Sequence, residues 1–244
     1  MKQSRFTAML FCAAMGFFLI SCGGGEEKAA TETTATDSAA TVAPPPVNTI
    51  ITTAQNMMIV IHKVADFAKW KPVYEAHDSV RLANGLHSYV IGRGVQDSNM
   101  VLVAVKVDDL AKAKAFSKDA SLKQAMQKSG VKGAPKIMIV TATWQDTAVL
   151  TSVPRSITTF SIKDWDGWIK SFEEGKQERT DNGIAARVVG HDADDNKKVA
   201  LVTALLDTAK AFAYYKSDAL KKRREAGGVT SEPERFLFNI VARY

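Results

Sequence analysis

The amino-acid sequence predicts an α+β protein made of two tandem copies of one small domain, preceded by a segment that does not belong to the fold. Three observations predict this. The chain of 244 residues repeats itself at an offset of 98. Each repeat alternates short, β-branched apolar runs with longer runs of helical period. The first 56 residues hold a short apolar run and then a polar, proline-containing stretch, and neither is patterned like a core.

The chain begins with the features of an export signal. Lys2 and Arg5 precede an apolar run over residues 6–20, which is shorter than the roughly 20 residues that a membrane-spanning helix needs. The run closes on the tetrad LISC, which ends at Cys22 and resembles the lipobox of bacterial lipoproteins. The resemblance implies a signal peptide over 1–21 and lipidation of Cys22. The alternative is an ordinary signal peptide followed by an unrelated cysteine.

Residues 22–56 are predicted to be the lipidated cysteine and a disordered tether. They are rich in Gly, Ala, Thr and Pro and have no apolar period, so they bury too little to fold. Gly23 rather than Asp follows the cysteine, and the acidic pair Glu26-Glu27 comes next. By resemblance to exported lipoproteins, these residues favour an outer-membrane lipoprotein on the periplasmic or cell-surface face. The expected membrane partner is reached through the lipid anchor, at about 0.8 kcal/mol per buried methylene.

Composition excludes several function classes. Cys12 and Cys22 are the only cysteines and both precede the repeats, so the repeats offer no thiol for a disulfide, a nucleophile or a metal. The net charge of +6 is spread among interleaved acids and bases, without a basic stripe, so no nucleic-acid partner is expected. Histidines at metal-binding spacing and phosphate-binding glycine loops are absent from the sequence, which predicts no metal and no cofactor.

The repeat defines a first copy, residues 57–144, and a second copy, residues 155–244. One short run, Ala113–Phe116, matches Ala209–Phe212 only if the alignment slips by two residues. The remaining matches keep the offset and include Asp66, Trp70, Glu75, Arg81, Asn84, Gly85, Val90 and Gly92, which return as Asp164, Trp168, Glu173, Arg179, Asn182, Gly183, Val188 and Gly190. Their number and spread indicate a gene duplication.

Each copy is predicted to run strand, helix, strand, strand, helix, strand. In the first copy Asp66 is expected to cap a helix that has Pro72 in its first turn and ends at Asn84-Gly85. A second helix, 110–128, is expected to break near 117–121. The expected strands of the first copy are 57–64, 87–93, 100–107 and 136–144, and the second copy ends in a strand over 235–244.

A βαββαβ order over about 90 residues is the ferredoxin-like arrangement, whose helices cover only one face of an antiparallel sheet. A tandem copy can cover the other face, so we expect the two sheets to pack face to face as an intramolecular pseudo-dimer in a monomeric chain. The first copy resembles the dimeric α/β-barrel superfamily, the antibiotic-biosynthesis-monooxygenase-like group. The matching positions are the segment HKVADF (62–67), Trp70-Lys71, His77, Arg81, Gly85, 112–116, Leu122, Met126, Gly130-Val131 and Pro135.

One predicted helical face carries the candidate ligand-binding residues Trp70, Tyr74 and Arg81 together with His77. Their spacings of four, three and four place them side by side. One interpretation is a stripe packed on the sheet, with the Arg81 head paired to an acid. The other is a pocket wall on which Arg81 holds an anionic group and His77 is a catalytic candidate. His62, on the first strand, is either a structural histidine or a second catalytic candidate that lines the barrel interior.

Two functions remain. The first is a membrane-anchored, non-enzymatic module whose barrel binds a small apolar or anionic molecule. The second, implied only by the resemblance, is a cofactor-independent enzyme like the monooxygenases or cyclases of the superfamily, with His62 or His77 as its acid–base group. The second copy carries Phe160 and Gly175 in place of these histidines, which favours the binding module. Convergence of His62, His77 and Arg81 on one cavity would strengthen the enzyme hypothesis.

Overall fold

The computed structural model describes residues 48–244. The predicted signal peptide, Cys22 and the tether up to residue 47 lie outside these residues. No helix within 48–244 is long and apolar enough to cross a bilayer. The first copy contains β2 (Gln55–Val64), α1 (Phe67–Ala76), α2 (Asp78–Ala83), β3 (Leu86–Gly94), β4 (Met100–Val107), α3 (Leu110–Ser117), α4 (Ala120–Lys128) and β5 (Val131–Asp146). The second contains β6 (Arg155–Ser161), α5 (Trp165–Glu174), α6 (Lys176–Asp181), β7 (Ile184–Asp192), β8 (Lys198–Leu205), α7 (Thr208–Tyr215), α8 (Asp218–Ala226) and β9 (Glu234–Arg243).

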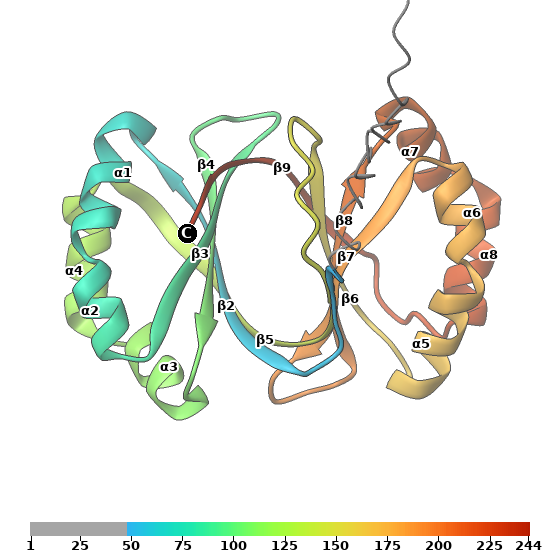
Figure 1. The fold of residues 1–244 in the computed structure, drawn as a ribbon, viewed down its shortest axis with the longest axis horizontal. Helices are drawn as coiled ribbons and strands as arrows, with labels where there is room; N and C mark the ends of the chain where they lie inside the picture. The colour runs from blue at the N-terminus through green and yellow to red at the C-terminus, as the bar shows by residue number, and fades with distance from the viewer. Residues whose placement is uncertain (1–47) are drawn as a thin grey trace, which may run out of the picture. The chain divides into compact units, whose positions relative to one another are not determined.

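The strands form one closed antiparallel barrel. Their order is β1-β5-β2-β4-β3-β9-β6-β8-β7, and β7 pairs back onto β5. Figure 1 shows the helices of the first copy outside one side of the barrel and those of the second copy outside the other. The predicted fold class, two ferredoxin-like copies that form a pseudo-dimeric α/β barrel, is therefore confirmed. The two sheets are hydrogen-bonded to each other, through β3–β9 and β5–β7, as well as packed.

The predicted tether extends too far towards the domains. The short strand β1 (Ile50–Ile51) pairs with the end of β5, where the Thr49 hydroxyl donates to Asp146 Oδ1 at 2.8 Å. The domain itself starts with β2 at Gln55 rather than at 57. Ile50 and Ile51 remain exposed, so the hydrogen-bonding edge of β5 orders this segment rather than apolar burial.

The two copies align at a constant offset of 98, and the predicted two-residue slip is wrong. Helices α3 and α7 begin after the caps Asp109 and Asp207, which are 98 residues apart. Their buried residues also correspond at this offset: Ala113 and Phe116 in α3, Ala211 and Tyr214 in α7. The slip had matched Phe116 to Phe212, which is 41% exposed. Two equivalent helices align by their buried faces. The identical residues of 113–116 and 209–212 lie on different faces of α3 and α7, so their match does not reflect the structural alignment.

Pro72 lies in the middle of α1, not in its first turn as predicted. The helix begins at Phe67 because Asp66 Oδ1 accepts from the amides of Ala68 and Lys69. An interior proline removes one helical hydrogen bond, and the helix is interrupted soon afterwards at His77. However, the second copy breaks at the equivalent Gly175 without a proline in α5. The break therefore belongs to the fold and does not depend on the proline.

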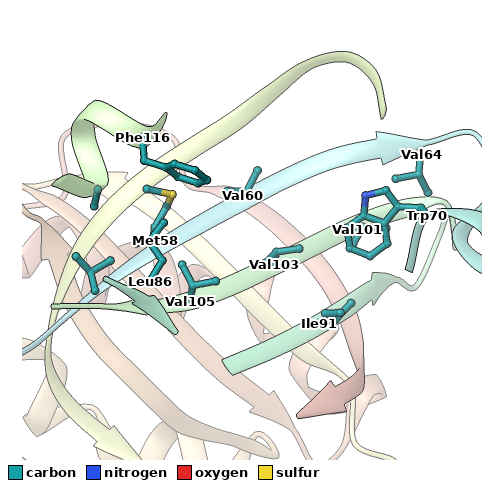
Figure 2. Close-up of a cluster of buried hydrophobic side chains, with 12 residues drawn as sticks. Met58, Val60, Val64, Trp70, Leu86, Ile91, Val101, Val103, Val105 and Phe116 are labelled. Atoms are coloured by element: carbon teal, nitrogen blue, oxygen red, sulfur yellow. The ribbon is translucent and has the colours of Figure 1, made fainter. Parts of the chain in front are cut away.

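The barrel has separate cores inside and outside. The interior is filled by side chains from both copies, among them Met57, Ile59, Val90, Ile157 and Phe238. Outside, the helices of each copy cover their own part of the sheet with a core of their own. Figure 2 shows the outer cluster of the first copy, in which Trp70 and Phe116 lie toward opposite ends of the row of strand residues.

Candidate functional site

A mostly apolar cavity of the first copy lies between its helices and the outer face of the sheet, at the cluster shown in Figure 2. Its volume is about 250 Å³. All five candidate residues of the sequence line it: His62, Trp70, Tyr74, His77 and Arg81. The remaining walls are mostly apolar and come from Met58, Val60, Val73, Val80, Leu86, Val103, Val105, Phe116, Leu122, Ala125 and Met126.

This cavity is not where a functional His62 was expected. Successive side chains of a strand point to opposite faces, and on β2 the odd-numbered Met57 and Ile59 fill the barrel interior. The even-numbered Met58 and Val60 face the helices, and so does His62. The prediction that His62 lines the barrel interior is therefore wrong. Inside the barrel, one cavity of about 80 Å³ lies among the packed side chains, and a more open one of about 340 Å³ is lined in part by Met138, Val140 and Ala200 of the interior cluster.

His62 is the least satisfied polar side chain of the site. It is only 4% exposed, and neither Nδ1 nor Nε2 has a hydrogen-bond partner within residues 48–244. Its ring packs on Trp70, with 5.4 Å between ring centroids. The strand is irregular at this point, because its pairing with β5 shifts between Ile61 and Lys63.

Burial fixes the charge state of His62. Desolvation lowers its pKa from 6.5 to about 4, because an imidazolium ion in an apolar site loses its hydration without gaining an anion. At neutral pH the ring is uncharged, with one nitrogen a donor and the other an acceptor. The hydrogen-bonding capacity of both nitrogens is unused within residues 48–244.

Arg81 takes part in a complete network instead of projecting a free charge. It is 8% exposed and donates to the carbonyl of Tyr74 at 2.7 Å, to Asp78 Oδ1 at 2.9 Å and to Ser88 Oγ at 3.2 Å. Its guanidinium carbon lies 3.8 Å from the centre of the Tyr74 ring. The Tyr74 hydroxyl in turn shares a 3.0 Å hydrogen bond with Ser88 Oγ. The charge of Arg81 is therefore neutralised by Asp78, and this wall of the cavity carries no unpaired cation.

His77 lies at the rim. It is exposed at the break between α1 and α2, and its Nδ1 is 2.9 Å from the Val73 carbonyl. A carbonyl oxygen can only accept, so Nδ1 is the donor in that contact. The remaining histidines lie outside the cavity: His87 pairs with Asp108 at 2.7 Å, and His191 packs edge-on against Trp165. Residues 48–244 contain no group of three or more His, Cys, Asp or Glu side chains placed to hold a metal ion.

The size of the cavity limits what it can hold. Sites for drug-sized ligands span roughly 300–1,000 Å³, so about 250 Å³ suits a molecule of one or two fused rings. A haem macrocycle exceeds this space. His62 could not reach a haem iron unless the helices moved away from the sheet, so the residues present do not fit that group.

The second copy has an equivalent cavity of different character. It measures about 100 Å³ and lies between α5–α8 and the sheet. Phe160 replaces His62 and keeps the aromatic contact, with its ring 5.6 Å from that of Trp168. Gly175 replaces His77, and a Cβ at this position would lie 2.7 Å from Arg223 Cδ. The missing histidine side chain thus makes room for an arginine from α8.

Sequence reasoning found the first cavity but missed most of the second. Among the second copy's cavity residues it had considered Phe160, Trp168 and Arg179, and not Thr203, Arg223, Arg224 or Arg235. A signal was present: at the offset of 98, these four residues replace Val105, Ala125, Met126 and Ile137. A change from apolar to polar or charged residues at corresponding positions marks a changed site, although only the tertiary structure shows that these positions meet.

No family model and no curated protein matches the sequence. Solved structures match in fold. An anthrone oxidase-like protein shares 13% identity over 79% of this chain and 94% of its own, with a TM-score of 0.52. A Fusobacterium nucleatum protein provisionally named a monooxygenase shares 10% over 78% and 93%, with a TM-score of 0.49. A heme-binding protein from Thermus thermophilus shares 10% over 79% and 93%, with a TM-score of 0.45. At these identities the similarity shows the fold alone, that of the dimeric α/β barrels.

Proposed function

We propose that the chain is a binding protein whose first copy encloses a small, uncharged, planar apolar molecule with one polar group. The observation that carries this proposal is His62. A buried imidazole with two unpartnered nitrogens costs stability, and a ligand that hydrogen-bonds to it would offset that cost.

The charges around the cavity support an uncharged ligand over an anionic one. Arg81 is the cation among the lining residues of this cavity, and it is already paired with Asp78. His62 is neutral because burial lowers its pKa to about 4. An anion would have to displace Asp78 from Arg81, whereas a hydroxyl or carbonyl group on an apolar ring needs only the free nitrogens of His62.

The titration of His62 also favours binding over catalysis. A general base is most effective when its pKa lies near the working pH. With a pKa of about 4, His62 is a weak base that stays neutral, as suits a hydrogen-bonding contact.

The test is the affinity of the full chain, reconstituted in lipid nanodiscs, for 2-naphthol, with protein-free nanodiscs as the blank. Isothermal titration calorimetry compares the wild type with His62→Phe, which installs the residue of the second copy. Loss of one hydrogen bond, worth about 0.5–1.5 kcal/mol, should weaken binding by about two- to ten-fold. The same change removes an unsatisfied polar group and should raise the free energy of unfolding by about 1–3 kcal/mol.

The opposite directions of the two effects distinguish a binding residue from a structural one. His87→Phe, at an exposed histidine outside the cavity, is the control and should change neither quantity appreciably. A His62→Phe protein that binds 2-naphthol as well as the wild type would show that His62 only packs on Trp70.

One observation favours the alternative that the first copy is an enzyme: His62 and His77 line the same cavity. A cofactor-independent oxygenase of this class would consume dioxygen in the presence of an easily oxidised substrate. We would measure oxygen uptake with anthrone for the wild type and for His77→Phe. Uptake that depends on His77 would replace the binding proposal, whereas no uptake above the protein-free rate would exclude this reaction.

We further propose that Cys22 anchors the chain to the outer membrane. Its support is the LISC tetrad after the apolar run. Cys22→Ala should move the protein from the membrane to the soluble fraction after cell lysis. Continued membrane association of this variant would argue against a lipid anchor, and protease treatment of intact cells would distinguish the two faces of the membrane.

A further inference from the structure

We propose that the second copy carries a separate site for a small organic anion, a carboxylate on a planar apolar body. The site is the cavity between α5–α8 and the sheet. Its floor is aromatic, formed by Phe160, Trp168 and Phe172, with Trp168 and Phe172 stacked at 5.2 Å between ring centroids. This proposal does not depend on the function of the first cavity.

Four guanidinium groups line this cavity: Arg179, Arg223, Arg224 and Arg235. Of these four arginines, only Arg223 is ion-paired within residues 48–244, through Nε to Glu178 Oε2 at 2.6 Å. Glu173 lies near Arg179 and Glu232 near Arg224, but neither forms an ion pair with them. Burial lowers the pKa of Arg179, Arg224 and Arg235, which reflects the cost of holding several cations away from water. A bound anion would offset this cost.

Arg179 shows how the site arose from the pattern of the first copy. Its equivalent, Arg81, donates to Asp78 and Ser88. The second copy has Lys176 and Ala186 at those positions, so both acceptors are lost. Arg179 still donates to the Phe172 carbonyl and lies over the Phe172 ring, 3.6 Å from its centre. The guanidinium of Arg179 thus keeps its position in the fold, but the second copy lacks the carboxylate that pairs with Arg81 in the first copy.

Three polar atoms of lining residues have no partner within the described part of the chain: Thr203 Oγ1, Tyr214 Oη and Arg235 Nε. Thr203 is 4% exposed and Tyr214 5% exposed. Their equivalents in the first copy are Val105, Phe116 and Ile137, whose side chains need no partner. Buried polar atoms are normally hydrogen-bonded, so two hydroxyls and a guanidinium on residues that line one cavity indicate an acceptor in it. A carboxylate supplies one, since its oxygens accept from hydroxyl and guanidinium groups alike.

The aromatic floor and the volume of about 100 Å³ favour one ring with a carboxylate over inorganic phosphate. The test is calorimetric titration of the full chain in nanodiscs with benzoate, with its neutral analogue benzamide and with inorganic phosphate. Benzoate should bind at least ten-fold more tightly than benzamide, and phosphate should compete weakly. Equal affinity for benzoate and benzamide, or binding of phosphate without benzoate, would overturn the proposal.

Two variants locate the site by restoring first-copy residues. Arg235→Ile and Arg224→Met should each weaken benzoate binding at least ten-fold. Lys197→Met, at an exposed cation in the loop before β8, is the control and should leave benzoate binding within two-fold of the wild type. Benzoate affinity that survives both Arg235→Ile and Arg224→Met would show that the anion binds elsewhere.

Wild-type protein supplies a measurement that needs no variant. A ligand that binds only the folded state raises the unfolding temperature in proportion to the logarithm of its concentration. Benzoate should raise the unfolding temperature, and benzamide at the same concentration should raise it less. Equal shifts with the two compounds would contradict an anion site.

Discussion

At the scale of single residues, the most informative side chain is His62. The fold needs an aromatic ring at this position, since Phe160 fills the equivalent place against Trp168. A phenylalanine would pack there without an unsatisfied polar atom. Histidine therefore retains a polar edge at a cost in stability, a trade that proteins commonly make at functional sites.

The titration of His62 predicts how stability depends on pH. Burial holds its pKa at about 4 in the folded chain, against 6.5 for a free side chain. Between about pH 6.5 and pH 4 the unfolded chain binds a proton that the folded chain does not, so the free energy of unfolding falls as the pH falls through this window. The full effect is roughly 3 kcal/mol.

Urea unfolding at pH 7.0 and pH 4.5 measures this effect. Wild type should lose up to roughly 3 kcal/mol more than His62→Phe between the two values, because other acid-sensitive groups contribute equally to both proteins. An identical loss in both proteins would mean that His62 is hydrated in solution.

At the scale of elements, the first and third helices of each copy begin with the same kind of cap. Asp66, Asp109, Asp164 and Asp207 all accept hydrogen bonds from amides of the first turn. The cap at Asp66 also sets the start of α1 and thus the rotation that turns Trp70 and Tyr74 towards the cavity. The helix stripe was predicted from spacing alone; the cap accounts for its register.

Asp66→Ala should reduce the free energy of unfolding by about 1 kcal/mol, because two amides of the first turn lose their acceptor. Asp66→Asn, whose amide oxygen can still accept, is the matched control and should cost much less. Thermal or urea denaturation distinguishes the two. If both variants lost the same stability, the negative charge of Asp66 would matter more than its hydrogen bonds.

At the scale of the whole molecule, the barrel closes where strands of different copies meet. Gly92 on β3 lies at the junction with β9, and Gly190 on β7 at the junction with β5. A Cβ at 190 would lie 2.4 Å from the Thr141 carbonyl oxygen, and a Cβ at 92 would lie 2.4 Å from the Phe238 ring. Both glycines allow close approach between strands, and neither has a positive φ.

The two glycines should not tolerate alanine equally. Gly190→Ala would press on backbone that cannot move without breaking the β5–β7 pairing, and we expect a loss of about 3 kcal/mol or more, the upper end for steric changes in a packed interior. Gly92→Ala would press on a side chain that can shift, so a smaller loss of about 1–2 kcal/mol is expected. Urea denaturation gives both values, and the reverse order would contradict this account of barrel closure.

The sequence predicted much of the fold because the relevant signals are local or repeated. Asp66 as a cap, Gly85 as a left-handed residue with a φ of +67°, and the break between α3 and α4 were all predicted and are present. The alignment of α7 with α3 was predicted wrongly. Residues 209–212 are identical in type to 113–116, but the buried residues of the two helices correspond at the offset of 98. The order of residues 48–56 was missed because their strand pairing depends on β5, far away in the chain.

By itself, the sequence determined the duplication, the βαββαβ order and the helical face that carries Trp70, Tyr74, His77 and Arg81. These follow from periodicity and caps, which act between neighbours in the chain. Only the tertiary structure decided that His62 faces the helices, that Arg81 is neutralised while Arg179 is not, and that four arginines of the second copy meet in one cavity. The physical reason is that burial and charge pairing depend on which distant segments pack together, and local pattern does not contain that information.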